Sequence, residues 1–444
     1  MLSIMPERQT QPVLASGGGR ILAMWSGLEG DHASLRTAVL SEEGEVISRG
    51  IATLAFLASD EVSWNGSEYL ALHQTSGEIW PTLRVTLIDA NGDPIDATPI
   101  ELEGIDRGST PGFWWQRPAS VVWTGTQWMV AWPQGDVVVL YFISPAGVAT
   151  SGRTLALSPA LPPTWWRRID AAAIASDGTR ILLVWKETQD ELCYFPVCGN
   201  AVSFTRAIRL TAEGELSGEA LELPILRSSS HFSMAGSGTE FVVAGATTAV
   251  AIEAGDPVLR VKATLALRGN ADVAWDGREY VFAYRRHAWQ WYLETSRFDG
   301  SLDPIQESRY LRTPPPDRND VPSVAATSPL PALIASQEGD QETGGRAVVY
   351  REDEMAPLPR VPGPPLNVQT RRLPGGRYET TWDAPPIGVV DAYYFEERTP
   401  DGRLITAGYV SGGDRSRITD FADVRVRASN ATGLSATRQR AARH

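Results

Sequence analysis

Short apolar segments separated by turn residues follow one another along most of the chain. A recurring phrase places a Gly-containing turn before an apolar run, as in Trp64-Asn-Gly-Ser-Glu-Tyr-Leu-Ala-Leu and Trp275-Asp-Gly-Arg-Glu-Tyr-Val-Phe-Ala-Tyr. Asn-Gly and Asp-Gly between apolar runs indicate β-hairpins, and we expect type I′ turns, in which both central residues have positive φ. The pattern therefore predicts antiparallel strands rather than helices.

The phrase is repeated as far as residue 335. Five clear copies occupy residues 64–72, 123–132, 176–185, 236–244 and 275–284. A weaker first copy occupies residues 18–25, and a degenerate last copy occupies residues 328–335. A second turn follows most copies, at Gly44, Gly92, Gly147, Gly214 and Gly300. Each unit therefore holds four strands, which is typical of a propeller blade. We predict seven blades, which begin near residues 11, 55, 116, 167, 229, 270 and 318, and an open array of β-sandwiches is the alternative.

A proline-rich segment follows the last copy. Five of the nine residues from Pro357 to Pro365 are proline, which predicts a stiff extended spacer. The seventh blade has no clear outer strand before this spacer, so we expect residues 2–5 to supply one. The predicted organisation is a propeller over residues 1–356, a linker over 357–365 and a second domain over 366–444.

The repeats resemble the degenerate β-propeller repeats of bacterial extracellular proteins. They lack the Asp-box of sialidases, because Ser176-Asp-Gly has no spacer residue, and they lack the Gly-His and Trp-Asp signature of WD40 blades. The resemblance implies an all-β fold with a seven-bladed β-propeller and implies no activity.

The last 80 or so residues resemble a fibronectin type III domain, a β-sandwich of seven strands. The resemblance rests on Pro364-Pro-Leu-Asn-Val, on the segments 378–385, 390–398 and 424–435, and on their order. It implies that Trp382 is buried on the second strand. Ala422 stands where the family has its corner tyrosine, so we expect the corner hydrogen bond to be absent and the domain to be less stable than its relatives.

The net charge of −13 is unevenly distributed. Residues 361–444 hold 12 Arg against 9 acidic residues, so they carry +3 and the remainder carries −16. An acidic body disfavours nucleic acid and anionic membrane surfaces. No run approaches the ~18 apolar residues of a membrane span. The first 19 residues do not form a secretory signal, so we expect either a removed signal or a route that needs none.

The two cysteines, Cys193 and Cys198, lie five residues apart. They are too few for a four-thiolate zinc site. We predict a disulfide that closes a loop, with two inert thiols as the alternative. A disulfide implies an oxidising compartment, and we therefore expect an extracellular, cell-surface or virion location.

Tryptophan is the most informative residue type. Seven of the 15 belong to the repeat phrase and are expected to pack between blades, namely Trp25, Trp64, Trp123, Trp128, Trp132, Trp185 and Trp275. The candidate ligand-binding residues fall in connections on one face of the predicted propeller, namely Trp80, Trp114, Trp115, Trp165, Trp166, Trp289 and Trp291. The pairs at 114–115 and 165–166 occupy equivalent connections. Such rings suit a protein partner or a glycan, and packing is the alternative.

Catalytic and metal-binding signals are weak. The internal histidines, His32, His73, His231 and His287, are expected in solvated loops of the same face, without metal-ligand spacing. Carboxylates expected there are Glu29, Asp31, Glu78, Glu187, Asp190, Glu338, Asp340 and Glu342. Two of them can serve a glycosidase only at a suitable separation, which sequence spacing does not show. The chain has no Gly-x-Ser-x-Gly, phosphate-binding or dinucleotide motif, so we predict no metal, cofactor or catalytic residue.

Three functions fit these observations. The favoured one is a noncatalytic extracellular binding or adhesion protein, within a larger extracellular assembly, whose aromatic and acidic propeller face meets a protein or glycan. The second is a structural or receptor-binding component of a virion or phage tail. The third is a carbohydrate-active enzyme, a glycosidase or a lyase.

Overall fold

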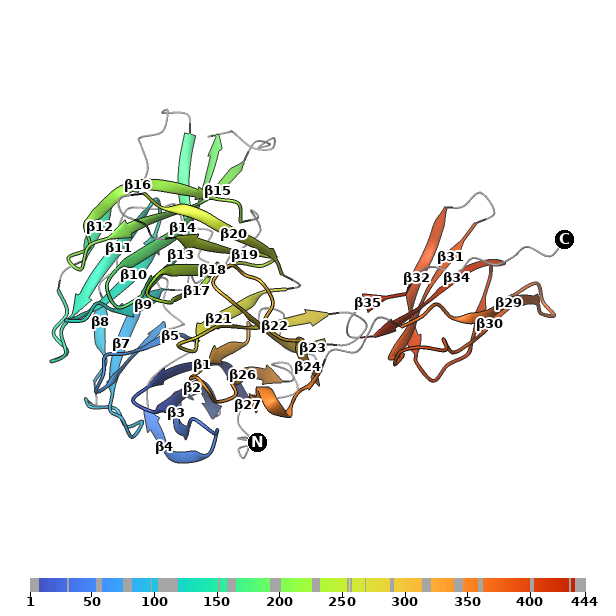
Figure 1. Cartoon of the computed structure of the whole chain (residues 1–444), viewed down its shortest axis with the longest axis horizontal. Coiled ribbons are helices and arrows are strands. Elements are labelled where there is room, and N and C mark those ends of the chain that lie inside the picture. The colour runs from blue at the N-terminus through green and yellow to red at the C-terminus, as the bar shows by residue number, and fades with distance from the viewer. Residues whose placement is uncertain are drawn as a thin grey trace. The chain divides into compact units, whose positions relative to one another are not determined.

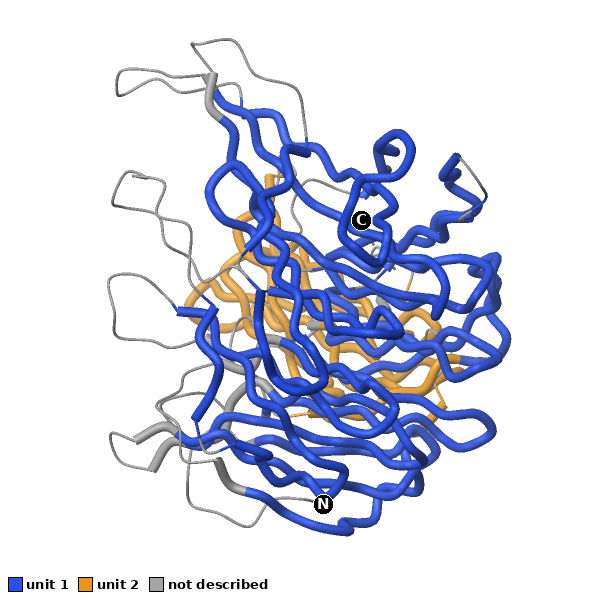
Figure 2. Tube along the Cα trace, turned by 90° about the vertical axis from the view of Figure 1, so that its left-hand side faces the viewer, with its two compact units in different colours: residues 1–285, 293–307, 314–355 blue, residues 286–292, 308–313, 356–444 orange. Residues whose placement is uncertain are grey.

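The protein is described by a computed structural model. It describes residues 8–29, 32–52, 58–74, 82–96, 98–102, 119–150, 152–157, 165–191, 201–225, 232–253, 255, 258–267, 269–287, 291–313, 321–338, 346–357, 362–399, 403–430 and 433–435. The chain divides into two compact units, shown in different colours in Figure 2. The first unit is Met1–Arg285, Leu293–Glu307 and Pro314–Met355, and the second is Arg286–Tyr292, Ser308–Thr313 and Ala356–His444.

Nearly all regular structure in the described residues is β-strand, which confirms the prediction of an all-β chain. The strands before the sandwich are β1 (Arg8–Gly17), β2 (Arg20–Glu29), β3 (His32–Ser41), β4 (Val46–Ala52), β5 (Ala58–Trp64), β6 (Tyr69–Gln74), β7 (Leu83–Ile88), β8 (Ile100–Leu102), β9 (Ser120–Trp123), β10 (Trp128–Gln134), β11 (Val137–Ile143), β12 (Arg153–Leu155), β13 (Trp165–Ser176), β14 (Ile181–Glu191), β15 (Val202–Leu210), β16 (Leu216–Leu223), β17 (Ser233–Gly236), β18 (Glu240–Ala244), β19 (Thr248–Glu253), β20 (Arg260–Ala266), β21 (Ala271–Trp275), β22 (Tyr280–His287), β23 (Trp291–Phe298), β24 (Arg309–Thr313), β25 (Ser323–Ala325), β26 (Leu333–Glu338), β27 (Arg346–Arg351) and β28 (Ala356–Pro357), with one 3-10 turn, η1 (Glu352–Glu354).

These strands form antiparallel sheets that follow one another in chain order (Figure 1). The first five sheets are β1–β4, β5–β8, β9–β12, β13–β16 and β17–β20; the next is β21-β22-β23-β24-β28, and the last is β25-β26-β27. The first strand of each sheet contacts the first strand of the next, and β25 contacts β1. The sheets thus close into a ring, which is the arrangement of a β-propeller. Among the described residues, the last sheet has no fourth strand; residues 2–5, expected to supply it, lie outside them.

The first turn of the first six repeats contains a glycine with positive φ. Gly66 has a φ of 107°, and Asn65 Oδ1 accepts the N–H groups of Ser67 and Glu68 at 2.8 Å each. Ser67 does not share the positive φ. Positive φ at the first central residue alone defines a type II′ turn, so type I′ was wrong for this turn. The Asn side chain bonds the second half of the turn and thereby fixes its type. The first sheet does have the predicted pattern, because Gly18 and Gly19 have φ of 61° and 72°.

Apolar clusters fill the space between neighbouring sheets. One cluster joins the second sheet to the third through Leu72, Trp128 and Trp132, and another joins the first sheet to the last through Leu40 and Leu333. All seven Trp of the repeat phrase lie in such clusters, which confirms their predicted packing role. Three rings pack at an angle against the aromatic residue across their own turn, in the pairs Trp64–Tyr69, Trp123–Trp128 and Trp275–Tyr280.

The second turn of a sheet docks on the preceding sheet. Thr37 Oγ1 donates to Gly92 O at 2.7 Å, and Arg351 Nη1 donates to Glu43 O at 3.0 Å, so the first sheet docks on the last. In the sixth sheet the left-handed residue of this turn is Leu302, with a φ of 60°, rather than the predicted Gly300. The Leu302 side chain is buried in the neighbouring apolar cluster, which offsets a backbone cost of ~1–2 kcal/mol.

A polar side chain on the first strand links each of several sheets to the next. Ser120 Oγ accepts the backbone N–H of Ile174 at 3.0 Å, and Ser323 Oγ accepts that of Leu14 at 3.0 Å. Equivalent links join Glu61 to Val121, Ser233 to Val273 and Asp272 to Val324. Each acceptor on β5, β9, β17 and β21 lies five residues before its turn glycine. The link from Ser323 closes the ring, because it joins the last sheet to the first.

The second unit contains a β-sandwich. Its strands are β29 (Leu366–Arg372), β30 (Tyr378–Asp383), β31 (Ala392–Arg398), β32 (Leu404–Ser411), β33 (Ser416–Thr419), β34 (Asp423–Asn430) and β35 (Gly433–Leu434), in sheets β29-β30-β33 and β32-β31-β34-β35. Trp382 is buried between the sheets with Tyr393 and Phe395, as predicted. At the corner near Ala422, Glu397 Oε1 accepts the N–H groups of Asp420 at 2.9 Å and Phe421 at 3.2 Å. A carboxylate thus bonds the backbone where the expected tyrosine is missing.

Candidate functional site

The fourth sheet has the longest strands among the described residues of the ring. β13 and β14 have 12 and 11 residues, whereas β9 and β10 of the third sheet have 4 and 7. The β13–β14 pairing runs from Ser176 opposite Ile181, beside the turn, to Trp165 opposite Glu191. β14 is four residues longer than β10, which corresponds to about 13 Å at ~3.3 Å per residue. The fourth sheet therefore extends well beyond the length of the third at the end away from its tight turn.

The far end of this ladder carries one of the two predicted tryptophan pairs. Trp165 lies opposite Glu191, and Trp166 lies opposite Asp190. Aromatic and acidic residues thus face one another on adjacent strands. The backbones of Trp165 and Trp166 are described, and their side chains lie outside the described part.

The other predicted site residues lie wholly or partly outside the described part of the chain. Trp291 begins β23, and its side chain is also outside the described part. Trp80, Trp114, Trp115, Trp289, Cys193 and Cys198 all lie outside the described residues. Their grouping on one face and the disulfide therefore stay predictions.

A buried carboxylate supports the ladder on one face of the sheet. Glu187 is fully buried, although the sequence places it in a solvated loop. Its carboxylate accepts Trp185 Nε1 at 3.3 Å and Arg206 Nη1 at 3.1 Å, and Gln189 Nε2 also donates to it. Arg167 Nε lies 3.8 Å away. Two arginines thus neutralise one buried acid, and breaking such a pair leaves an uncompensated charge.

A second polar network lies on the opposite face, since neighbouring residues of a strand point to opposite sides. Asp170 forms the β-bulge of β13, where Arg168 and Thr188 donate to it and Lys186 Nζ lies 3.9 Å away. Burial lowers the pKa of Lys186, and Arg168 lowers it further, while Asp170 opposes both. Thr188 is also within 2.8 Å of Ser203 Oγ on β15. The ladder is therefore braced by side chains from three strands.

The sequence indicated this site only in part. The segment 185–191, Trp-Lys-Glu-Thr-Gln-Asp-Glu, follows an apolar run and looks like the start of a loop. Up to residue 189, its odd-numbered residues contribute to the network around Glu187 and its even-numbered residues to the network around Asp170. This alternation with a period of two could have shown that the strand continues. His73 is a second correction, because it lies on β6 and is fully buried instead of solvated. Burial, reinforced by Arg84, holds its pKa well below the usual value.

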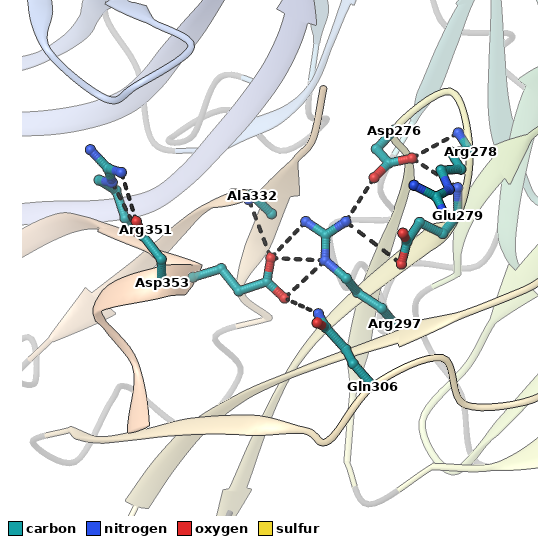
Figure 3. Close-up of polar contacts among 9 residues, drawn as sticks. Asp276, Arg278, Glu279, Arg297, Gln306, Ala332, Arg351 and Asp353 are labelled. Carbon is teal, nitrogen blue, oxygen red and sulfur yellow. Dashed lines mark hydrogen bonds and ion pairs between the residues drawn. The ribbon is translucent and has the colours of Figure 1, made fainter. Parts of the chain in front are cut away.

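A separate ionic cluster surrounds Arg297 (Figure 3). Its Nη2 donates to Glu352 Oε2 at 2.7 Å and its Nη1 to Asp276 Oδ2 at 2.7 Å. Ala332 N and Gln306 Nε2 also donate to Glu352, at 3.3 and 3.4 Å. Burial tends to lower the pKa of Arg297, but Glu352 and Asp276 outweigh it and raise the pKa. The guanidinium is enclosed by its partners, so the cluster joins the sixth sheet to the last and has a structural role.

Metal ligands do not converge in the part of the chain that the structure describes. No group of three or more His, Cys, Asp or Glu side chains there is arranged to hold a metal ion. Among the same residues, none forms a helix with the length and hydropathy needed to cross a bilayer.

Comparison with known proteins gives distant structural likeness alone. No family model and no curated protein matches the chain. One similar solved structure is a prolyl endopeptidase, with 14% identity over 96% of this chain and 54% of the other and a TM-score of 0.46. The β-propeller domain of the Trilobed protease from Pyrococcus furiosus has 8% identity over 77% of this chain and 96% of the other, with a TM-score of 0.41. Hsv2 of Kluyveromyces lactis has 10% identity over 76% of this chain and 98% of the other, with a TM-score of 0.38. Likeness at this level says nothing of activity or partner.

Proposed function

We propose that the chain is a noncatalytic binding protein, in which a seven-bladed β-propeller followed by a fibronectin type III domain presents the end of its fourth blade to a protein or glycan. The ring of sheets in chain order supports the blade count. The split of the sandwich strands into β29-β30-β33 and β32-β31-β34-β35, with Trp382 in the core, supports the fibronectin assignment. The proposal includes action outside the cell, at a cell surface or on a virion, within a larger assembly.

The observation that carries the proposal is the braced ladder of the fourth sheet. A strand that extends about 13 Å beyond its neighbour costs backbone entropy to order. Its shaft is nevertheless held by a buried polar network centred on Glu187 and a partly buried one centred on Asp170. The ladder ends with two tryptophans opposite two acids. Preorganised aromatic groups bind with little loss of entropy, which suits a recognition surface.

Single alanine variants at Trp165 and Trp166 test this proposal. The labelled full-length protein is applied to an array of defined glycans and to arrayed candidate proteins, and each variant is compared with wild type on every bound spot. A binding tryptophan contributes at least ~2 kcal/mol, so each variant should lose about 30-fold in affinity while its melting temperature stays near that of wild type. Leu216→Ala, at an exposed apolar position of the same sheet, is the matched control.

Two results would contradict the proposal. If the rings are part of the packed interior, both variants should lose about 3–5 kcal/mol of stability. If the array glycans are released as cleaved products, the protein is an enzyme of the carbohydrate-active class instead.

A further inference from the structure

Unpaired sheet edges attract other strands, and proteins usually protect them with a charge, a proline, a β-bulge or a short length. The described edge strands of the sandwich and the outer strands of the ring follow this rule with one exception. Strands of three or more residues carry charges at Arg49 in β4, Glu101 in β8, Arg153 in β12, Glu219 in β16, Lys262 in β20, Arg346 in β27, Arg371 in β29 and Arg417 in β33. β28 and β35 have two residues each, and β28 contains Pro357. The exception is β32, which has a bulge at Ile405 and no such protection from Thr406 to Ser411.

β32 is an edge strand of eight residues, Leu404-Ile-Thr-Ala-Gly-Tyr-Val-Ser, with neither charge nor proline. It ends the sheet β32-β31-β34-β35, and none of the described residues pairs with its outer side. Its apolar side chains are exposed, at 48% for Leu404, 43% for Ile405 and 39% for Tyr409. A long apolar edge of this kind is a surface for strand addition.

We propose that β32 pairs with β32 of a second copy of this chain, antiparallel and about a two-fold axis. The two four-stranded sheets then join into one continuous sheet. The proposal is independent of the site on the fourth sheet, because β32 lies in the sandwich.

Charge favours a second copy as the occupant. An uncharged strand that pairs with itself places no like charges opposite one another. Arg403 precedes β32, and Asp414 lies in the turn that follows it. Arg415 of the same turn donates to the carbonyl oxygens of Gly412 and Asp414. In an antiparallel pair each end therefore brings Arg403 of one copy towards Asp414 of the other. The two-fold axis repeats this complementarity at both ends, as an isologous interface requires.

Sedimentation of the full-length protein over a concentration series tests the pairing. We expect the average mass to rise from the monomer value of 48.3 kDa towards twice that value. Ala407→Lys places a charge near the middle of β32. The two-fold axis brings this lysine close to the same lysine of the second copy, so the variant should weaken association at least tenfold. Ser416→Lys adds the same charge to the exposed edge strand β33 of the other sheet and should leave association unchanged. Thermal melts establish that both variants are folded.

A protein that stays monomeric throughout, or a dimer that Ala407→Lys leaves intact, overturns the proposal. Amide hydrogen exchange of the wild-type protein gives a second readout that needs no variant. Protection of β32 amides should increase with protein concentration, while protection of β33 amides should not. A dimer whose β32 exchange is independent of concentration uses another surface and also overturns the proposal.

Discussion

Replacing Ser323 by alanine tests how the ring is closed. Ser323 Oγ accepts the Leu14 N–H at 3.0 Å, and both residues are buried. Alanine removes the acceptor and leaves a buried N–H without it, which costs ~1–3 kcal/mol. We expect Ser323→Ala to lower the free energy of unfolding by about 2 kcal/mol. Ser323→Asp should retain most of the stability, because Asp272 performs the same task at 2.7 Å from Val324 N.

Urea unfolding followed by far-UV circular dichroism measures the effect. The midpoint should fall while the slope with denaturant stays constant, since the surface exposed on unfolding is unchanged. Ser217→Ala on β16 is the matched control and should lie within about 0.5 kcal/mol of wild type. A Ser323→Ala protein as stable as this control, or an aspartate variant as unstable as alanine, would show that closure does not depend on the link.

Two further predictions concern buried charge. Glu352→Ala should lower the free energy of unfolding by about 3–5 kcal/mol, because it removes the principal acceptor of the buried Arg297 guanidinium. Asp353→Ala, at the next residue, is the control and should lower it little. Equal urea midpoints for the two variants would refute this. His73 stays neutral in the folded protein because its pKa is lowered, so the unfolded chain alone takes up a proton as the pH falls below ~6.5. Wild type should therefore lose up to about 1.4 kcal/mol per pH unit below that point relative to His73→Gln, and parallel stability profiles between pH 7.5 and 5.5 would contradict the argument.

The sequence predicted the repeat well because local chemistry determines it. A positive φ at Gly66 and an aromatic pair such as Trp64 and Tyr69 across the turn are properties of a few neighbouring residues. The type of this turn was mistaken, because it depends on the conformation of Ser67 under the bonds from Asn65. Leu302 was missed for a different reason. Its left-handed backbone is offset by burial against another sheet, which no local pattern reveals.

The candidate site shows the same division. The sequence located Trp165 and Trp166 as a conspicuous pair, but it did not show that their strand continues in register to Glu191. Glu187 was assigned to a loop because acidic residues are usually exposed. Its burial depends on Arg206 of a third strand, 19 residues away. Such pairings arise from the sheet as a whole, so they cannot be inferred from one segment.

Chemical footprinting of tryptophan tests the central claim most directly. The native protein is treated briefly with an indole-specific oxidant, and mass spectrometry of its peptides reports the oxidation of each tryptophan. Trp128, Trp185 and Trp382, which are at most 2% exposed, provide the internal standard for buried rings. The account predicts that Trp165 and Trp166 are oxidised well before these three and become protected when a bound glycan or protein is present. Oxidation of Trp165 and Trp166 as slow as that of Trp128 would contradict it, because a buried ring cannot form a binding surface.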